Sequence, residues 1–225
     1  MFAAWVYLRR LRHAITMTPR KQLDAGSSDK NAHIAKVVLP YNESLAWKIS
    51  RNRTERLLNV LSTIGDVDHK NSRVLSIGPR NEAELLLMRL YGFDLKNISA
   101  IDLFSHSPLI DVMDMHDLKF SDSRFDIVYS SYVLRYSNDI ARACSEAVRV
   151  TRDAGLIAIA FVHSPTPSPL VGAQLSGGLE ELFGYFGDHV KHTYWNLKFT
   201  IDTKALNCTA DEYAEAVEAE GIIPC

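Results

Sequence analysis

Small or acidic residues stand at the ends of four apolar segments, and these residues have the clearest capacity for chemistry. They are Gly78 at the end of RVLSIG (73–78), Asp102 in ISAIDL (98–103), Asp114 after LIDVM (109–113) and Ser130 in FDIVYSS (125–131). A glycine after a strand lets the backbone approach a ligand, and the helix that follows offers free N–H groups. A carboxylate after the next strand can accept hydrogen bonds from two ribose hydroxyls. The pattern predicts a site for a nucleotide or nucleoside.

Alternating strands and helices must bring these residues together. The predicted strands are 73–78, 98–103, 109–113, 125–131 and 156–162, and the predicted helices are 43–65, 81–92, 137–151 (capped by Ser137) and 179–190. Apolar strands between amphipathic helices predict an α/β, Rossmann-like, doubly wound and mostly parallel sheet with helices on both faces. Ligands bind such sheets at the carboxyl ends of the strands. The Ser130–Ser131 pair is therefore expected on the same edge as the glycine and the two carboxylates.

The segment 112–160 carries a family resemblance. It resembles class I S-adenosylmethionine-dependent methyltransferases of the methyltransferase type 11 domain family. That family typically has D-A-x-x-L-P-F, a polar turn, S-F-D-x-V, V-L-x-H, a helix, and R-V-L-K-P-G-G before an apolar strand. The matching positions are Asp114, Leu118, Phe120, Phe125, Asp126, Val128, Val133, Leu134, Arg149, Val150 and Gly155. With a weaker first half, the resemblance spans residues 73–162.

The resemblance implies S-adenosylmethionine as the cofactor and a role for several residues. Asp102 would hold the ribose, Asp114 the adenine amino group, and Ser130 would lie near the methionine end. The backbone of Met115 would face the adenine ring. The full implied set is Gly78, Pro79, Arg80, Glu82, Asp102, Leu103, Asp114, Met115, His116 and Ser130. Structural roles in turns and helix caps remain open for Gly78, Asp102 and Asp114, and Asp126 is interpreted as structural.

The glycine motif departs from the family pattern D-x-G-x-G-x-G. Here Ser76 replaces the acidic residue, and Arg80 and Glu82 replace the later glycines. Their side chains could narrow the pocket, or Glu82 could supply a carboxylate for the methionine ammonium. Two further departures are Tyr136 for the histidine of V-L-x-H, and residues 152–155 (RDAG) for K-P-G-G.

No catalytic base stands out, and Tyr136 and His163 are the two candidates. His106 and His116 lie in predicted loops, where a single histidine is usually a surface residue. His189 and His192 have no third ligand at a suitable spacing, so no metal is predicted. GxSxG, P-loop and HExxH motifs are absent from the sequence.

The composition bounds the class of protein. The chain has 225 residues, 47% of them hydrophobic and 23% charged, with a formal net charge of −2 and three cysteines. This balance predicts a cytoplasmic protein without a disulfide framework and without a global attraction for nucleic acid. The family resemblance, and not the composition, implies a small molecule or glycan as the acceptor. The sequence indicates no oligomeric state.

The two ends of the chain give weaker signals. Residues 1–35 are predicted as an N-terminal helix and a polar linker, and residues 36–225 as a single methyltransferase-like domain. The apolar run before Arg9 is far shorter than the roughly twenty residues that span a bilayer. The basic, aromatic residues 1–13 allow peripheral membrane contact instead. Residues 164–178 are predicted as a substrate loop or a plain connector, followed by the helix at 179–190, strand material at 191–202 and an acidic terminal helix.

Three hypotheses follow. The leading one is methyl transfer from S-adenosylmethionine to an acceptor that the sequence does not identify. The alternative is a degenerate methyltransferase fold that acts as a binding or scaffold protein, with Arg80 and Glu82 filling the cofactor pocket. A nicotinamide-dependent oxidoreductase is disfavoured because GxGxxG is absent.

Overall fold

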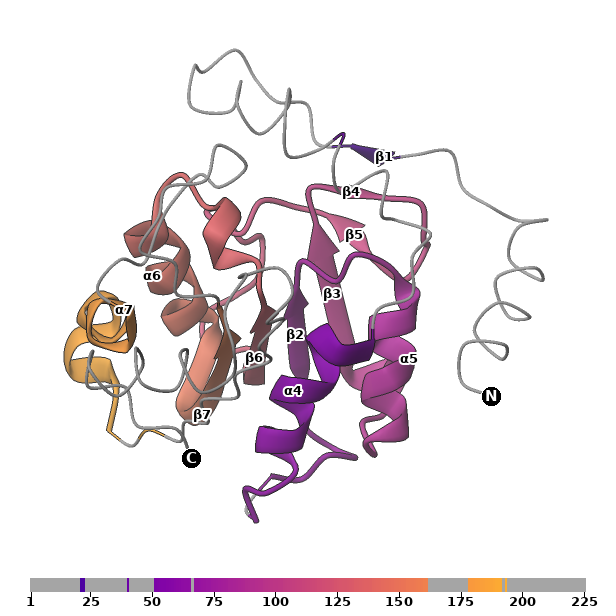
Figure 1. The fold of residues 1–225 in the computed structure, drawn as a ribbon, viewed down its shortest axis with the longest axis horizontal. Coiled ribbons are helices and arrows are strands. Elements are labelled where there is room, and N and C mark those ends of the chain that lie inside the picture. The colour runs from indigo at the N-terminus through magenta and orange to yellow at the C-terminus, as the bar shows by residue number, and fades with distance from the viewer. Residues whose placement is uncertain are drawn as a thin grey trace, which may run out of the picture. The chain divides into compact units, whose positions relative to one another are not determined.

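The computed structural model describes residues 21–22, 40, 51–65, 67–161, 178–191 and 193, and their core is a five-stranded parallel sheet (Figure 1). Its strands are β2 (Val74–Ile77), β3 (Ile98–Asp102), β5 (Asp111–Val112), β6 (Phe125–Ser131) and β7 (Thr151–Ala160). Their order is β5-β3-β2-β6-β7, and every neighbouring pair is parallel. The order reverses between β2 and β6, which is the switch point of a doubly wound sheet. The predicted fold class is confirmed.

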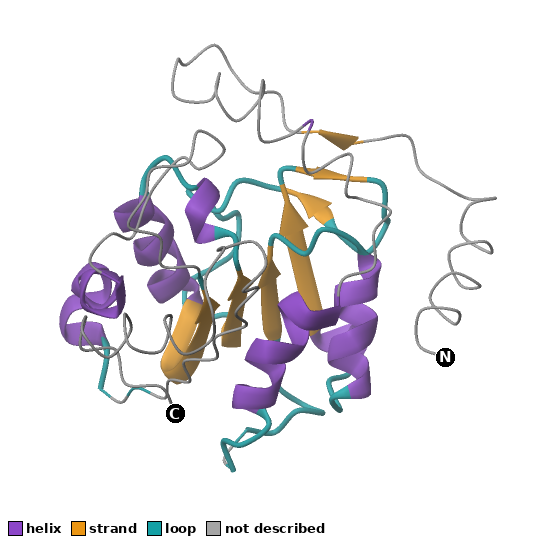
Figure 2. Cartoon of the chain, in the orientation of Figure 1, coloured by secondary structure: helices purple, strands orange, loops and turns teal. Residues whose placement is uncertain are grey.

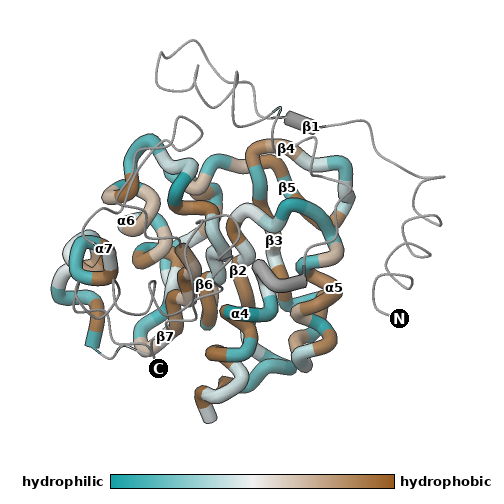
Figure 3. Tube along the Cα trace, viewed as in Figure 1, coloured by the Kyte–Doolittle hydropathy of each residue, from teal (hydrophilic) through white to brown (hydrophobic). Residues whose placement is uncertain are grey.

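Helices cover both faces of this sheet (Figure 2). One face packs against α4 (Arg51–Leu61) and α5 (Glu82–Leu90), and the other against α6 (Ile140–Val150) and α7 (Gly178–Phe186). Successive residues of β2 alternate between the two cores, with Val74 in the first and Leu75 in the second. Hydrophobic residues recur along the strands and the helices that form these two cores (Figure 3).

The central strands are buried on both faces. All four residues of β2 are buried, and in β6 only Asp126 is partly exposed. This explains the uninterrupted apolar runs in the sequence, since a strand covered on both faces has no polar side.

The start of α6 differs from the prediction. Asp139, not Ser137, caps this helix, because its Oδ1 accepts a hydrogen bond of 3.0 Å from the backbone N–H of Arg142. The Ser137 hydroxyl accepts instead from the N–H of Asp139 at 3.0 Å. Ser137 therefore lies two residues before the cap.

The strand β7 begins five residues earlier than predicted. Thr151 pairs with Phe125, and Leu156 pairs with Ile127, so β7 advances five positions while β6 advances two. The expected turn at 152–155 is thus a bulge within a strand. Ala154 in this bulge has φ of 56°, a left-handed conformation that favours glycine.

A small antiparallel pair was not predicted. Residues Lys21–Gln22 (β1) pair with Phe104–Ser105 (β4), directly after the end of β3. The predicted linker at 18–35 therefore contains a two-residue strand. Among the described residues, no helix is long and apolar enough to span a membrane.

Several predictions lie outside the described residues. They concern the helix and membrane contact at 1–13, His163, His192, the loop at 164–177 and the C-terminal elements from 194 onward. The described part of the predicted helix at 43–65 is α4, and the helix predicted at 179–190 is α7 followed by a 3₁₀ turn (Gly187–His189).

Candidate cofactor site

Backbone hydrogen bonds align the ends of three neighbouring strands. The N–H of Gly78, after β2, donates to the carbonyl of Ile101 in β3 at 2.7 Å. The N–H of Met113, after β5, donates to the carbonyl of Asp102 at 3.0 Å. On the other side of β2, Ser130 of β6 is in register with Ile77. The structure therefore brings Gly78, Asp102, Asp114 and Ser130 to one edge of the sheet, as predicted.

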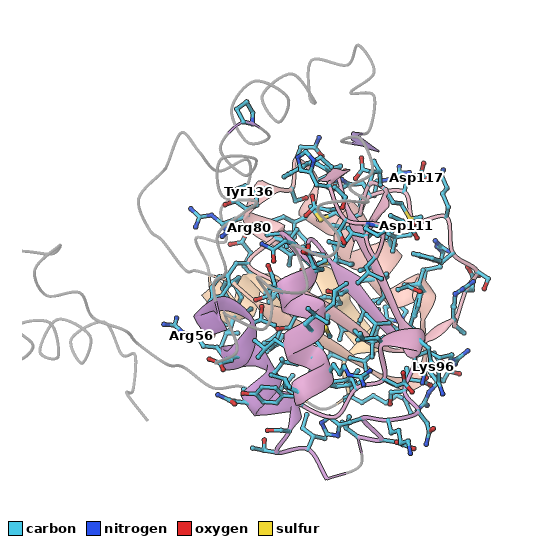
Figure 4. The ribbon with its side chains drawn as sticks, turned by 90° about the vertical axis from the view of Figure 1, so that its right-hand side faces the viewer. Arg56, Arg80, Lys96, Asp111, Asp117 and Tyr136 are labelled. Atoms are coloured by element: carbon cyan, nitrogen blue, oxygen red, sulfur yellow. The ribbon has the colours of Figure 1, made fainter. Side chains whose placement is uncertain are left out.

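The side-chain view is consistent with this end of the sheet being the site. Arg80, Tyr136, Asp111 and Asp117 lie toward one end of the described part, and Lys96, just before β3, lies toward the other (Figure 4). Arg80, Tyr136 and Asp117 follow the carboxyl ends of strands. Asp111 begins β5 and is in register with Ile101, near the carboxyl end of β3.

The buried carboxylate of Glu84 holds the turn after β2. Glu84 is 7% exposed, and its two carboxylate oxygens accept from the N–H of Arg80 at 3.0 Å and from the hydroxyl of Thr54 at 2.9 Å. Glu82, which the sequence suggested as the replacement carboxylate, is the partly exposed first residue of α5. Asn81 caps that helix by accepting from the N–H of Ala83 at 3.0 Å.

Gly78 has a conformation and a contact that require glycine. Its φ is 69°, and an added Cβ would lie 2.4 Å from Cγ2 of Val133. Val133 belongs to the V-L pair of the sequence motif and follows β6. The loops after β2 and β6 thus touch at the switch point, where Pro79 is also buried.

Asp102 lies at the end of β3 and is partly exposed, as is Leu103. One carboxylate oxygen of Asp102 accepts from the N–H of Leu103 at 2.7 Å. This fixes the carboxylate at the edge where the resemblance places the ribose.

Asp114 forms a hydrogen-bonded unit with His116. Oδ1 of Asp114 accepts from the backbone N–H of His116 at 2.9 Å and lies 2.6 Å from its Nδ1. On the other side of the ring, Nε2 lies 2.7 Å from the hydroxyl of Ser137. Partial burial opposes ionisation of Asp114, but its hydrogen bonds with His116 and the nearby Arg142 leave the pKa of this carboxyl below its usual value. Asp114 is therefore ionised at neutral pH.

The loop that follows Asp114 is tied to α6 by Arg149 and Glu146. The guanidinium of Arg149 donates to the carbonyls of Leu118 and Phe120 at 2.9 and 2.8 Å and to Glu146 at 2.8 Å. A carboxylate oxygen of Glu146 accepts from the N–H of Leu118 at 2.7 Å. Arg149 of the sequence motif R-V-L therefore fixes the loop that carries Asp114.

Ser130 carries an unusual polar atom. It is 4% exposed, and its hydroxyl has no hydrogen-bond partner among the described residues. Buried hydroxyls normally have a partner, so an orphan at the edge of a sheet indicates a place where a ligand atom can bind. Met115, by contrast, contributes its side chain to the core on the α6 side of the sheet.

Of the two candidate bases, Tyr136 lies among the described residues and His163 lies outside them. Tyr136 ends a 3₁₀ turn (Leu134–Tyr136) after β6, is partly exposed, and has the Arg135 guanidinium 5.6 Å from its ring centroid. His106 stacks edge-on with Phe104 at 6.4 Å between ring centroids, in the β4–β5 connection. In the described part of the chain, no three His, Cys, Asp or Glu side chains group as a metal site.

Residues 76–159 match the family model described as a methyltransferase domain. The match begins inside β2 and ends inside β7, so it includes residues from all five strands of the parallel sheet and covers less than half of the chain. This part of the chain is therefore similar to a methyltransferase domain. A search of curated proteins finds no match.

Solved structures with a similar chain trace include several methyltransferases. YcgJ from Bacillus subtilis is 17% identical, with 73% of this chain and 82% of that chain covered and a TM-score of 0.42. An S-adenosylmethionine-dependent methyltransferase from Mesorhizobium loti is 19% identical, with 48% and 53% covered and a TM-score of 0.40. One from Thermotoga maritima is 13% identical, with 69% and 80% covered and a TM-score of 0.40. This chain spans about half of the Mesorhizobium loti protein. Because all three scores lie below 0.5, the fold assignment rests on the strand order and on the family match.

Sequence reasoning missed three supports of the methyltransferase domain. They are the packing of Val133 on Gly78, the hydrogen bonds of Glu84 beneath the glycine turn, and the bond between His116 and Ser137. Each joins residues from different loops or elements, so no local pattern reveals it. The signal that was available is positional, because Val133 begins the V-L-R-Y segment shortly after β6 and Ser137 directly follows that segment.

Proposed function

We propose that the methyltransferase domain binds S-adenosylmethionine at the carboxyl edge of its sheet and transfers the methyl group to a small-molecule or glycan acceptor. The observation that supports this most is positional. The segment that matches the family model carries Gly78, Asp102 and Asp114 to adjacent strand ends, where ionised and buried polar atoms face one edge.

The residues present fit the cofactor in three places. Asp102 lies where the two ribose hydroxyls would donate to a carboxylate. All side-chain hydrogen bonds of Asp114 fall on Oδ1, which leaves Oδ2 as an acceptor for an amino group. The orphan hydroxyl of Ser130 gives a third polar contact, on the opposite side of β2.

The chemistry required of the chain itself is mostly alignment. S-adenosylmethionine supplies an electrophilic methyl group when bound. The protein must hold an acceptor nucleophile in line with that group and keep competing water out, and such orientation contributes much of the rate in bimolecular transfers. Tyr136 follows β6 at the same edge and is the described candidate for taking up a proton from the acceptor.

The net charge disfavours one class of acceptor. With a formal net charge of −2, the chain has no global positive field to concentrate a polyanion. A small molecule or a neutral glycan is therefore the preferred acceptor, and nucleic acid is not proposed.

Isothermal titration calorimetry with S-adenosylhomocysteine tests the cofactor assignment. We expect the wild-type chain to bind, and Asp102→Asn and Asp114→Asn to weaken binding by roughly 10- to 100-fold each, the loss of a hydrogen bond to a charged group. Asp117→Asn is the matched control, because Asp117 is an exposed carboxylate in the same loop as Asp114, with its side chain 58% exposed. Absence of binding by the wild-type chain at millimolar ligand contradicts the proposal and favours a scaffold role.

A further inference from the structure

Four residues form a continuous chain of hydrogen bonds from the start of α6 to the loop after β5. The N–H of Asp139 lies 3.0 Å from the Ser137 hydroxyl, which lies 2.7 Å from Nε2 of His116. Nδ1 of His116 lies 2.6 Å from Oδ1 of Asp114. Ser137 is fully buried and His116 is 9% exposed, so the middle of this chain is shielded from water.

The chemistry of the two ends fixes the direction of every bond. Asp114 is ionised and can only accept, so Nδ1 of His116 must carry a proton. The Ser137 oxygen already accepts from the Asp139 N–H, and within the described part of the chain the only acceptor in reach of its own proton is Nε2 of His116. In the neutral form of its ring, His116 is therefore the tautomer that carries its proton on Nδ1.

This arrangement orients the carboxylate. Oδ1 of Asp114 receives two donors from His116, the ring N–H and the backbone N–H, while Oδ2 receives none. The ring itself is fixed at Nε2 by Ser137, and the carbonyl of His116 accepts from Nε of Arg142 at 2.6 Å. The plane of the carboxylate is thus set by contacts that reach back to α6.

The order Asp–His–Ser is also that of a nucleophilic triad, but the burial excludes that use. Ser137 has no exposed surface. Its hydroxyl already accepts a hydrogen bond from the N–H of Asp139 and is hydrogen-bonded to Nε2 of His116. A nucleophile must reach a substrate atom, so this serine can only act through His116.

We propose that His116 is a positioning residue which, supported by Ser137, presents Oδ2 of Asp114 to the 6-amino group of an adenine nucleoside and so selects adenine over hypoxanthine. This rests on the proposed function, because it assumes that the bound nucleoside is that of S-adenosylmethionine. Hypoxanthine carries a carbonyl oxygen in place of the amino group. A fixed carboxylate would face that oxygen without a shared proton, and two acceptors that face each other lose the hydrogen bond that adenine makes.

Two substitutions separate the contributions of the hydrogen bonds at Nδ1 and at Nε2 of His116. His116→Asn places an amide N–H near the position of Nδ1 and keeps the bond to Asp114. His116→Gln places its amide near the position of Nε2 and keeps only the bond to Ser137. Calorimetry with S-adenosylhomocysteine and S-inosylhomocysteine then gives the adenine preference of each protein, and thermal melting confirms folding.

We expect the wild-type chain to prefer the adenine ligand by roughly 10-fold or more, the value of one charge-assisted hydrogen bond. His116→Asn should keep this preference within about threefold, whereas His116→Gln should lose most of it. A folded His116→Gln protein with the wild-type preference overturns the proposal. A wild-type protein that binds neither ligand overturns both this proposal and the proposed function. If the wild-type protein binds and both variants have the same adenine preference, only the positioning role is overturned.

A second measurement does not depend on the variants. Long-range ¹H–¹⁵N correlation spectra of the wild-type protein report the tautomer of each of its 8 histidines, with the His116 signals assigned by comparison with His116→Asn. The expected result is a proton on Nδ1. A ring that carries its proton on Nε2 alone would overturn the proposal, since Asp114 would then lack its donor.

Discussion

An added Cβ at Gly78 would lie 2.4 Å from Cγ2 of Val133. These two residues follow β2 and β6, the strands between which the order of the sheet reverses. Their contact closes the base of the candidate cofactor site and leaves room for no side chain at position 78. Of the glycines in the family motif, this is the one the chain retains, and packing within the protein is a sufficient reason for it.

Gly78→Ala should destabilise the domain through two separable effects. The left-handed φ of 69° costs alanine roughly 1–2 kcal/mol, and the overlap with Val133 adds about 1–3 kcal/mol. Val133→Ala removes both Cγ atoms, so the double variant should recover part of the second effect. Urea denaturation of the two single variants and the double variant measures this coupling. Strict additivity would show that the two side chains do not compete for the same space.

The lowered pKa of Asp126 leads us to expect that the free energy of unfolding decreases in acid. Burial opposes its ionisation, but hydrogen bonds from Arg73 and Arg152 lower the pKa of Asp126 from 3.8 to about 2. A depressed folded-state pKa stabilises the protein above the unfolded value, and this stabilisation is lost as pH falls from about 4 to about 2. It amounts to at most about 2 kcal/mol, and to less after screening by solvent.

Thermal melts of the wild-type protein and Asp126→Asn across pH 2–7 provide the test. The difference between the two should be constant above about pH 5 and should shrink below about pH 4. Asp126 lies at the start of β6, at the end of the sheet away from the candidate site, so S-adenosylhomocysteine binding should not change. A difference that grows on acidification contradicts the assignment of Asp126 as the paired carboxylate.

Ala154 offers a stabilising substitution. Its φ of 56° lies in the left-handed region, where alanine is strained by roughly 1–2 kcal/mol. Ala154→Gly relieves this strain but gains disorder in the unfolded chain, so the net gain should be about 0.5–1 kcal/mol. Gly155 is the control, because its added Cβ would lie 2.5 Å from Cγ2 of Thr151 and 2.8 Å from the carbonyl of Arg152. Gly155→Ala should destabilise in the same urea titration, and equal signs for the two variants would refute the argument.

The sequence predicted the sheet well because its strands are buried on both faces. Residues 125–131 were predicted as a strand with the same bounds as β6, since a continuous apolar run leaves little freedom. The start of β7 was wrong by five residues. Its first half is polar and bulged, with exposed side chains at 152–154, so it lacks the apolar signal that marks the second half.

The site could be predicted only as far as strand ends. Gly78, Asp102 and Asp114 follow from topology, because parallel strands deliver their carboxyl ends to one edge. The bond between His116 and Ser137 joins residues 21 positions apart, and Ser137 was instead interpreted as a helix cap. The local pattern was compatible with both roles, and the burial of Ser137, a tertiary property, decided between them.

Arg149 gives a test of how the loop after Asp114 is held. Its guanidinium bonds Leu118, Phe120, Asp122 and Glu146 at once, at 2.7–2.9 Å. A lysine ammonium has three donors on one atom and cannot span these acceptors.

Arg149→Lys should therefore lower the free energy of unfolding by about 2 kcal/mol, the value of the hydrogen bonds it leaves unmade. It should also weaken S-adenosylhomocysteine binding, because the loop that carries Asp114 loses its tie to α6. Arg89→Lys is the matched control on the exposed side of α5 and should change stability by less than about 0.5 kcal/mol. If Arg149→Lys lost stability but bound S-adenosylhomocysteine as tightly as the wild-type chain, the loop would have to be positioned by Glu146 and His116 alone, through the N–H of Leu118 and the carboxylate of Asp114.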